Sequence, residues 1–338
     1  PELTCCESRY DSLKVTSYSQ GTNGIVYQQI VSGLPQLNEE QRQFLPLYTS
    51  FIPELGLGDG SYMDAQHRQS ATVGSINAFT TMRGSLDNEQ AITANFVLSS
   101  KALKRNAQQQ AQLMDDTLRT VRFDESDRIR DLISQQRARR EQAITGNGHG
   151  LAMAAACAGM SPLAALNHQL SGLAGIRAVR ALDLSMADAS EAEAFAARLG
   201  DIHNRVLGMP REVLAVAEEH EIAHLAELAG KQWSAHQPAE AGAHFSLDPV
   251  REKRSEMWLT NTQVNFCARA YPTVPVQHPD APALTVLGGF LRNGYLHRAI
   301  REQGVAYGGG ATQDAGPAAF KFYSYRDPCL GESLTDFV

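Results

Sequence analysis

The chain has 338 residues, a formal charge of −7 from 30 Lys and Arg against 37 Asp and Glu, and a hydrophobic content of 43%. This length fits two folded units better than one, and the apolar fraction excludes wholesale disorder. The acidic balance argues against a general nucleic-acid-binding protein. No apolar run approaches the roughly 18 residues that a transmembrane helix needs, so we expect no membrane partner.

The cysteines form no recognisable framework. Their number is odd, and no Cys-x-x-Cys pair occurs, so neither a disulfide scaffold nor a thiolate zinc site is predicted, and a reducing compartment is expected. The chain starts without Met and without a signal peptide, which we interpret as a start within a longer polypeptide. The cysteines are Cys5, Cys6, Cys157, Cys267 and Cys329.

The first part of the chain alternates strands and helices. Strands are predicted within residues 12–32, on either side of a Gly-Thr-Asn-Gly turn. A helix is predicted over Asn38–Leu55, because Asn38 and Gln41 have the spacing of a capping box. A short helix over Ser61–Ser70 and a strand pair follow, with the strands at Val73–Met82 and Gln90–Ser99.

The middle of the chain is predicted to be helical, and a similar order of elements then restarts. The expected helices are Leu103–Arg119, Asp127–Ala143, Ser161–Leu170 and Pro210–Ala229. The Pro- and Gly-containing stretch Lys231–Arg254 is interpreted as a linker. After it we expect a strand at Thr262–Ala270, helices at Ala281–Asn293 and Gly294–Glu302, and strands at Ala306–Thr312 and Ala318–Tyr325.

This restart indicates an internal repeat. Tyr62 and Tyr295 each stand before a short helix and a strand, at an offset of 233, and the same offset aligns Arg68 with Arg301. The chain is therefore interpreted as one complete α/β unit followed by the opening part of a second. Chance similarity is the alternative.

His220-Glu221-Ile222-Ala223-His224 matches the H-E-x-x-H zinc pattern. On a helix both histidines would lie on one face and could bind zinc, with Glu221 polarising a water molecule. No third ligand follows in a recognised spacing, so a solvated surface helix is the plainer interpretation. The reversed pattern H-x-x-E-H is absent from the chain.

Two glycine-rich stretches are weaker signals. The stretch 56–60 lies between two predicted helices and has no following Lys-Ser or Lys-Thr, so it is predicted to be a turn rather than a phosphate loop. Gly308, Gly309 and Gly310 lie in a predicted strand, where glycine allows a peptide or a neighbouring element to approach closely.

The segment Phe290–Pro328 resembles the C-terminal half of the pitrilysin/insulysin zinc peptidases, and especially their presequence protease branch. There, a helix ending in Arg precedes Ala-Tyr-Gly and then a strand ending in Ser-Tyr-Arg-Asp-Pro. Here these are Arg301, the run 306–308 and the run 324–328. The segments 22–27, 258–266 and 44–56 resemble the same branch.

The resemblance implies an α/β (α+β) fold of repeated pitrilysin-type domains, each a mostly antiparallel sheet packed with helices. Residues 1–11 would be the tail of a preceding linker, 12–231 the third domain, 232–257 a linker and 258–338 part of the fourth domain. In such peptidases two halves close around an unfolded peptide substrate. The missing N-terminal half binds the zinc, so no cofactor is expected in this chain.

By the same resemblance, Arg301 and Tyr307 would bind the substrate and the transition state, and this chain alone would be inactive. The partners would be the N-terminal half of the same polypeptide and the peptide. A bacterial cytoplasmic location is expected, with an organelle as the alternative. Two other hypotheses stay open: a catalytically silent partner half, and an autonomous protease using His220, Glu221 and His224.

Overall fold

The structure is a computed structural model that describes residues 4–238 and 242–337; residues 1–3, 239–241 and 338, which fall in the predicted linkers and the predicted fourth domain, lie outside it. The chain divides into two compact units. The first unit comprises residues 1–81, 94–133 and 185–245, and the second comprises 82–93, 134–184 and 246–338. Among the described residues, none of the helices combines the length and hydropathy needed to cross a bilayer.

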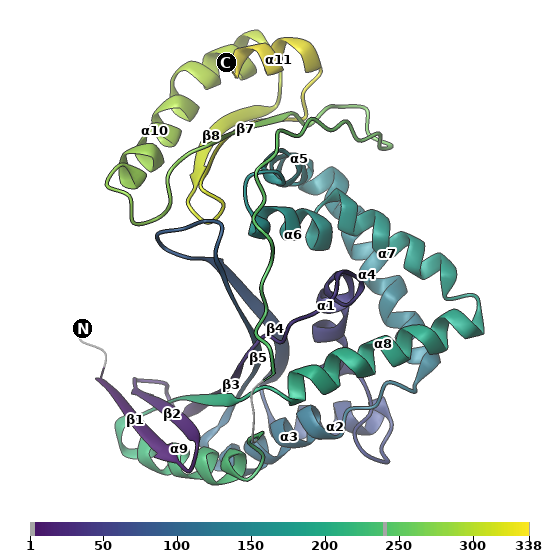
Figure 1. Cartoon of the computed structure of the whole chain (residues 1–338), viewed down its shortest axis with the longest axis vertical. Coiled ribbons are helices and arrows are strands. Elements are labelled where there is room, and N and C mark those ends of the chain that lie inside the picture. The colour runs from purple at the N-terminus through teal and green to yellow at the C-terminus, as the bar shows by residue number, and fades with distance from the viewer. Residues whose placement is uncertain (1–3, 239–241, 338) are drawn as a thin grey trace. The chain divides into compact units, whose positions relative to one another are not determined.

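The first unit is built on a six-stranded sheet in the order β1-β2-β6-β3-β5-β4 (Figure 1). β2 and β6 run parallel, whereas the pairs β1–β2, β3–β6 and β3–β5 are antiparallel. Alternate residues of β3, such as Val26 and Ile30, are buried in the core, as expected for a strand with one covered face. The strands are Thr4–Tyr10, Leu13–Ser19, Arg211–Ala217, Ile25–Gly33, Ile92–Leu103 and Ser75–Gly84, in sheet order.

The first two helices of the first unit begin within one residue of their predicted starts, whereas α8 was not predicted. The expected capping box at α1 is present, because Asn38 Oδ1 accepts from Gln41 N at 2.8 Å and Gln41 Oε1 accepts from Asn38 N at 2.9 Å. α9 packs against β1, β2 and β6, and α1 pairs with α8. The helices are α1 (Glu39–Phe51), η1 (Ile52–Glu54), α2 (Tyr62–Thr72), η2 (Lys104–Asn106), α3 (Ala107–Arg119), α8 (Ala189–Leu207) and α9 (Glu219–Ser234).

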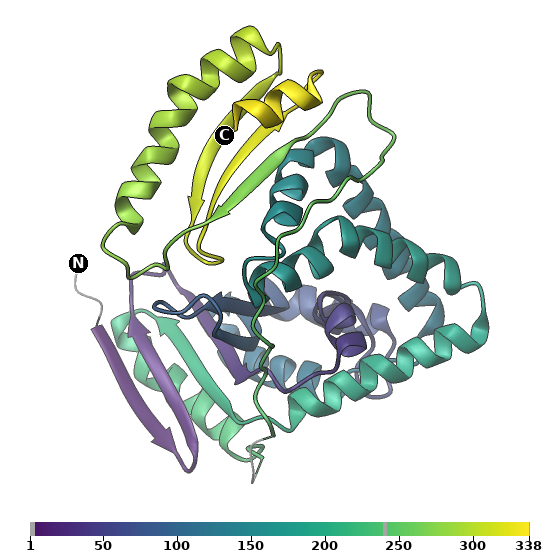
Figure 2. The same ribbon diagram turned by 45° about the horizontal axis from the view of Figure 1, so that its top comes forward.

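The second unit has a three-stranded antiparallel sheet in the order β7-β9-β8. α10 and η3 pack on β8, and α5 packs on β7 and β9 (Figures 1 and 2). The strands are β7 (Ala268–Pro272), β8 (Gly308–Asp314) and β9 (Ala319–Tyr325). The helices are α5 (Gly148–Cys157), α6 (Pro162–Ser171), α7 (Leu173–Ser185), α10 (Ala281–Asn293), η3 (His297–Gln303) and α11 (Leu330–Asp336); α4 (Ser126–Gly146) joins the units.

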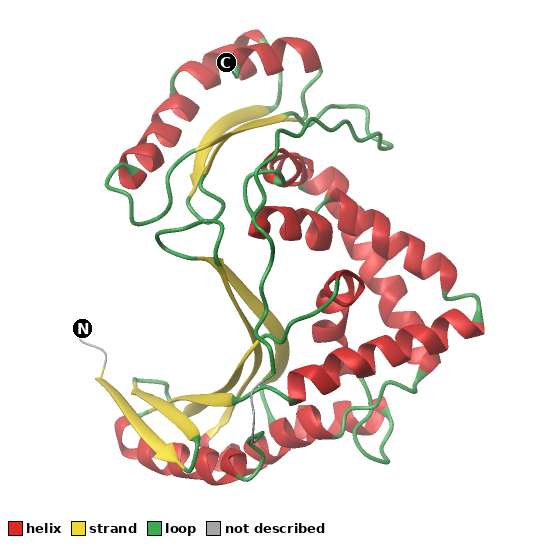
Figure 3. Cartoon of the chain, in the orientation of Figure 1, coloured by secondary structure: helices red, strands yellow, loops and turns green. Residues whose placement is uncertain are grey.

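The predicted internal repeat is confirmed by topology. β3, α1, α2, β4 and β5 follow one another in the first unit as β7, α10, η3, β8 and β9 do in the second. Figure 3 distinguishes helices from strands by colour. The two sets of strands also share one sheet order, β3-β5-β4 and β7-β9-β8. Together with the structural relatives described below, this confirms the predicted mixed fold of open, antiparallel-rich sheets packed with helices.

The predicted helix over Pro210–Ala229 is wrong in its first half. Arg211–Ala217 is instead strand β6, and α9 starts only at Glu219. The reason is a period of two, because Arg211, Val213, Ala215 and Ala217 are buried while the residues between them are more exposed. Alternating burial of this kind belongs to a strand with one covered face and not to a helix.

Two other predictions also need correction. Thr4–Tyr10, within the predicted linker tail 1–11, forms strand β1 and pairs with β2. The predicted strand Thr262–Ala270 begins only at Ala268, and before it Asn265 makes a single bridge to Asp327. The remaining domain boundaries stay a prediction.

A buried polar pair lies between α1 and α8. Tyr48 Oη and His203 Nδ1 are 3.0 Å apart, and both side chains are almost fully buried. Burial lowers the pKa of His203 from 6.5 to about 4 and raises the pKa of Tyr48. The imidazole is therefore neutral in the folded chain at pH 7 and can accept the phenol hydrogen.

We expect this pair to make the stability of the first unit depend on pH. Between pH 6.5 and about pH 4, His203 is protonated in the unfolded chain but stays neutral in the folded chain. The contribution of the neutral imidazole to the free energy of unfolding is therefore fully present above pH 6.5. As the pH decreases from 6.5 to about 4, the free energy of unfolding decreases by about 3 kcal/mol. Thermal unfolding at several pH values should show this loss, and His203→Gln should reduce it. The exposed His220→Gln should leave the pH dependence as in the parent, and an equal effect of both variants would contradict the assignment.

Candidate functional site

The turn between η3 and β8 carries both residues singled out from the sequence. The residues Leu296, Ala299 and Ile300, at the start of η3 and within it, are buried. Leu296 and Ile300 belong to the hydrophobic core of the second unit. Gly304 N donates to Ala299 O at 2.9 Å, which is the bond spacing of a π-helix, and Ala306 N donates to Ile300 O at 3.1 Å. These bonds tie the turn to the end of the helix.

Arg301 lies in the last turn of η3, as predicted, and its side chain is exposed. A cation is favoured there, because the carbonyl end of a helix carries partial negative charge. The guanidinium makes no hydrogen bond or ion pair with any residue that the structure describes. The neighbouring carboxylate, Glu302, lies 3.3 Å from His297 Nδ1 instead.

Tyr307 lies immediately before β8 and is 67% exposed. Its N–H donates to Arg326 O at 3.3 Å, and its ring packs edge-on against Tyr325 with 5.7 Å between ring centroids. Within the described part of the chain its hydroxyl has no hydrogen-bond partner. The turn thus presents one guanidinium and one phenol to solvent.

The three glycines of β8 differ in how much space surrounds them. A Cβ on Gly309 would lie 2.6 Å from Ile300 Cγ2, and one on Gly310 would lie 2.9 Å from Arg292 Cγ. The neighbouring elements that the sequence predicted for these glycines are therefore η3 and α10. Gly308 has no atom within 4 Å of an added Cβ.

At the aligned positions of the first unit, the arginine is paired and glycine stands in place of the tyrosine. The offset of 233 aligns Arg301 with Arg68 and Tyr307 with Gly74. Arg68 is held in an ion pair with Asp116 at 2.6 Å, and Gly74 N donates to Lys101 O at 2.8 Å. The aligned positions of the second unit therefore differ from their repeat in presenting a guanidinium and a phenol hydroxyl that have no hydrogen-bond or ion-pair partner among the described residues.

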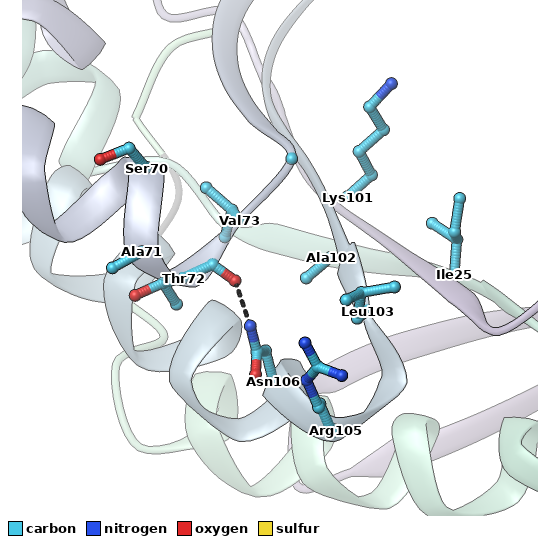
Figure 4. A pocket seen from close by; sticks show the side chains of 11 residues that line it. Ile25, Ser70, Ala71, Thr72, Val73, Lys101, Ala102, Leu103, Arg105 and Asn106 are labelled. Carbon is cyan, nitrogen blue, oxygen red and sulfur yellow. Dashed lines mark hydrogen bonds between the residues drawn. The ribbon is translucent and has the colours of Figure 1, made fainter.

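The corner of the first unit instead borders an open hollow of about 360 Å³ (Figure 4). Val73, Ala102 and Leu103 supply apolar surface, and Lys101 and Arg105 lie at its side. No pattern in the sequence pointed to this hollow. Asn106 Nδ2, which donates to Thr72 O at 2.9 Å, holds the end of α2 against η2.

His220, Glu221 and His224 lie on the first turns of α9, so their predicted helical placement is confirmed. Glu221 Oε1 accepts from Lys104 Nζ at 3.0 Å, and this bond lowers the pKa of the carboxylate. Both histidines are exposed. In the described ranges, no three His, Cys, Asp or Glu side chains are placed to hold a metal ion. These residues do not fit a catalytic zinc site.

Sequence reasoning missed the side chains around Tyr307. Tyr325 and Arg326 were noticed only as part of the Ser-Tyr-Arg-Asp-Pro run, yet the Arg326 guanidinium lies 6.0 Å from the centre of the Tyr307 ring. The signal that could have found them is the predicted pair of strands around Gly316 and Pro317, because antiparallel pairing places the end of the second strand beside the start of the first, with Tyr325 opposite Gly308.

Gly309→Ala should destabilise the second unit, because the added methyl group must displace the buried Ile300. We expect a loss of about 1–3 kcal/mol, measured as a lower unfolding temperature. Gly308→Ala is the matched control and should change stability by less than about 0.5 kcal/mol, since its methyl group enters open space. Equal losses in the two variants would contradict the packing described for η3.

We expect the purified chain to hold no stoichiometric zinc at His220, Glu221 and His224. Elemental analysis after exposure to zinc and dialysis should give the same metal content for the parent and for His220→Ala. Stoichiometric zinc that disappears in His220→Ala would revive the autonomous protease hypothesis.

Comparison with known proteins agrees with the resemblance seen in the sequence. The family profile for the region associated with peptidases of family M16, subfamily C, matches residues 2–182. The mitochondrial presequence protease of Yarrowia lipolytica is 28% identical over 315 residues, covering 93% of this chain and 32% of that protein. The Danio rerio enzyme of the same name is 28% identical over 344 residues, covering 94% and 33%. The chain thus spans about a third of the length of these relatives.

Solved structures share the fold. A conserved protein from Enterococcus faecalis V583 matches with a TM-score of 0.66 at 13% identity, covering 95% of this chain and 75% of that one. A protease from Helicobacter pylori matches with a TM-score of 0.59 at 13% identity, covering 99% and 78%. Since the family profile covers more than half of the chain and the relatives align with nearly all of it, the chain belongs to the family associated with subfamily C of the M16 peptidases and corresponds to part of the C-terminal half of a pitrilysin-type peptidase.

Proposed function

We propose that the chain is part of the half without zinc of a zinc metalloendopeptidase that degrades unfolded peptides inside a closed chamber. Arg301 and Tyr307 are its contribution to the reaction. The zinc is bound by an N-terminal half that carries H-x-x-E-H. Since the described residues here do not fit a zinc site, no step of the reaction is assigned to metal in this chain.

The observation that carries the proposal is the contrast between the two repeat-related corners. Arg301 is exposed and, among the described residues, unpaired in the second unit, whereas Arg68 is neutralised by Asp116 in the first. A side chain that only stabilised the helix–strand corner would gain from a partner within the fold. A guanidinium and a phenol hydroxyl that both lack a hydrogen-bond partner among the described residues, on one turn, instead suit a ligand that brings its own acceptors.

The chemistry of the two groups fits a peptide. A guanidinium has several fixed donors that can bind backbone carbonyl oxygens, and a phenol can donate to the oxyanion that develops when a peptide carbonyl is attacked. Such a donor is worth roughly 2–4 kcal/mol of transition-state stabilisation. Tyr307 is therefore proposed as the oxyanion donor and Arg301 as the group that orients the peptide.

The names of the relatives are relevant to the cellular compartment in which this chain is located. The curated relatives from Yarrowia lipolytica and Danio rerio are named as mitochondrial, and an Arabidopsis thaliana relative is named as chloroplastic and mitochondrial. These names support the organellar alternative over the bacterial cytoplasm expected from the sequence.

The proposal is tested in the complete peptidase that contains this chain. Tyr307→Phe and Arg301→Ala should each lower kcat/KM for an unstructured peptide by about 100-fold, because the first removes the oxyanion donor and the second removes the group that orients the peptide. Zinc content should not change. Arg139→Ala is the control, since Arg139 is also exposed in the second unit, and it should keep parental activity.

Activity of Tyr307→Phe and Arg301→Ala close to that of the parent would reject the site assignment. An upstream sequence in which H-x-x-E-H is degenerate, together with a complete protein that cleaves no peptide, would favour the silent partner half.

A further inference from the structure

The backbone around Tyr307 is held in an unusual conformation. Val305 and Arg326 have φ angles of 60° and 49°, although neither is glycine. The left-handed region is unfavourable for ordinary residues and especially for a β-branched one, and it persists only where surrounding contacts enforce it. Val305 lies two positions before Tyr307, and the Arg326 carbonyl accepts the Tyr307 N–H bond. Both strained positions therefore border the proposed oxyanion donor.

A buried carboxylate enforces the turn at Arg326. Asp327 is fully buried, and its Oδ1 accepts from Cys329 N at 2.8 Å. Asp327 also exchanges both backbone hydrogen bonds with Asn265, at 2.8 and 2.9 Å, while Asn265 Nδ2 donates to Asp327 O at 3.0 Å. The Asp-Pro end of the Ser-Tyr-Arg-Asp-Pro run is thus an anchor, and the two residues before it are fixed at the end of β9.

Both of those residues contact the Tyr307 ring. Tyr325 packs edge-on against it at 5.7 Å, and the Arg326 guanidinium lies 5.4 Å from the Tyr325 ring centre and 6.0 Å from the Tyr307 ring centre. Tyr325 is itself backed by His149 at 5.0 Å and by Phe266 at 5.7 Å. Aromatic pairs and cations near ring faces favour particular orientations, so the contacts restrict how the Tyr307 phenol points.

Arg326 is exposed and, within the described ranges, has no carboxylate partner. The contacts of its guanidinium there are with aromatic rings. A residue whose backbone accepts the Tyr307 N–H and whose side chain lies beside the Tyr307 ring is placed to set both the position and the orientation of that ring.

We propose that Tyr325 and Arg326 are positioning residues that hold the Tyr307 hydroxyl in its catalytic orientation. The inference rests on the proposed function of Tyr307. It predicts that losing either residue lowers kcat through misplacement of the hydroxyl, and that neither residue matters once the hydroxyl is gone.

The test is a double-mutant cycle in the complete peptidase. Arg326→Gly removes the guanidinium and relieves the left-handed backbone, Arg326→Lys keeps the charge, and Tyr325→Leu removes the ring contact. Each is measured for kcat and KM on an unstructured fluorogenic peptide, alone and combined with Tyr307→Phe. Zinc content and unfolding temperature are measured for every variant.

Arg326→Gly and Tyr325→Leu should each lower kcat about tenfold when Tyr307 is present, with a smaller loss in Arg326→Lys. In the Tyr307→Phe background the same changes should alter kcat by less than about twofold, because coupled residues are not additive. Equal losses in both backgrounds, or losses confined to KM, would overturn the inference.

Arg269→Ala is the matched control. Arg269 is also exposed in the second unit, and its guanidinium lies 5.3 Å from the centre of the Tyr271 ring. We expect it to leave kcat unchanged in both backgrounds, and a loss equal to that of Arg326→Gly would overturn the positioning role. If Tyr307→Phe alone has no effect, the proposed function fails instead, and the two failures are thereby distinguished.

Discussion

The second unit depends on the close packing of two helical elements on one glycine-containing strand. Ile300 is fully buried against Gly309, and Gly288 of α10 approaches the β8 backbone so closely that an added Cβ would lie 3.1 Å from Ala311 O. Larger residues at these glycines would push η3 and α10 away from β8. With the buried face of η3 fixed in this way, Arg301 must lie on its exposed side, and the turn to Tyr307 is short and bonded to the helix end.

The repeat explains why one corner is a candidate site and the other is not. Both corners have the same order of helix, turn and edge strand, so the fold alone offers two equivalent positions. The side chains differ. Asp116 neutralises the arginine of the first corner and glycine replaces the tyrosine, whereas the Arg301 guanidinium and the Tyr307 hydroxyl of the second corner have no hydrogen-bond or ion-pair partner among the described residues. The side chains of the corner, and not its fold, therefore mark the candidate site.

Local signals in the sequence predicted local structure well. Asn38 with Gln41 marked the start of α1, and the spacing of Tyr62 and Tyr295 revealed the repeat before the strand order was known. Arg211–Ala217 was misjudged because it is short, apolar and followed directly by a helix, so its period of two was interpreted as part of a longer helical pattern. The contact of Tyr325 with His149 on α5 could not be predicted, since it joins residues far apart in the sequence.

The most direct measurement is a crystal structure of the complete peptidase, in its closed form, with an uncleaved peptide bound. We expect the Tyr307 hydroxyl and the Arg301 guanidinium within hydrogen-bond distance, roughly 2.7–3.2 Å, of the peptide backbone near the scissile bond. A peptide whose scissile bond lies far from both groups, or contacts only the first unit, would contradict it.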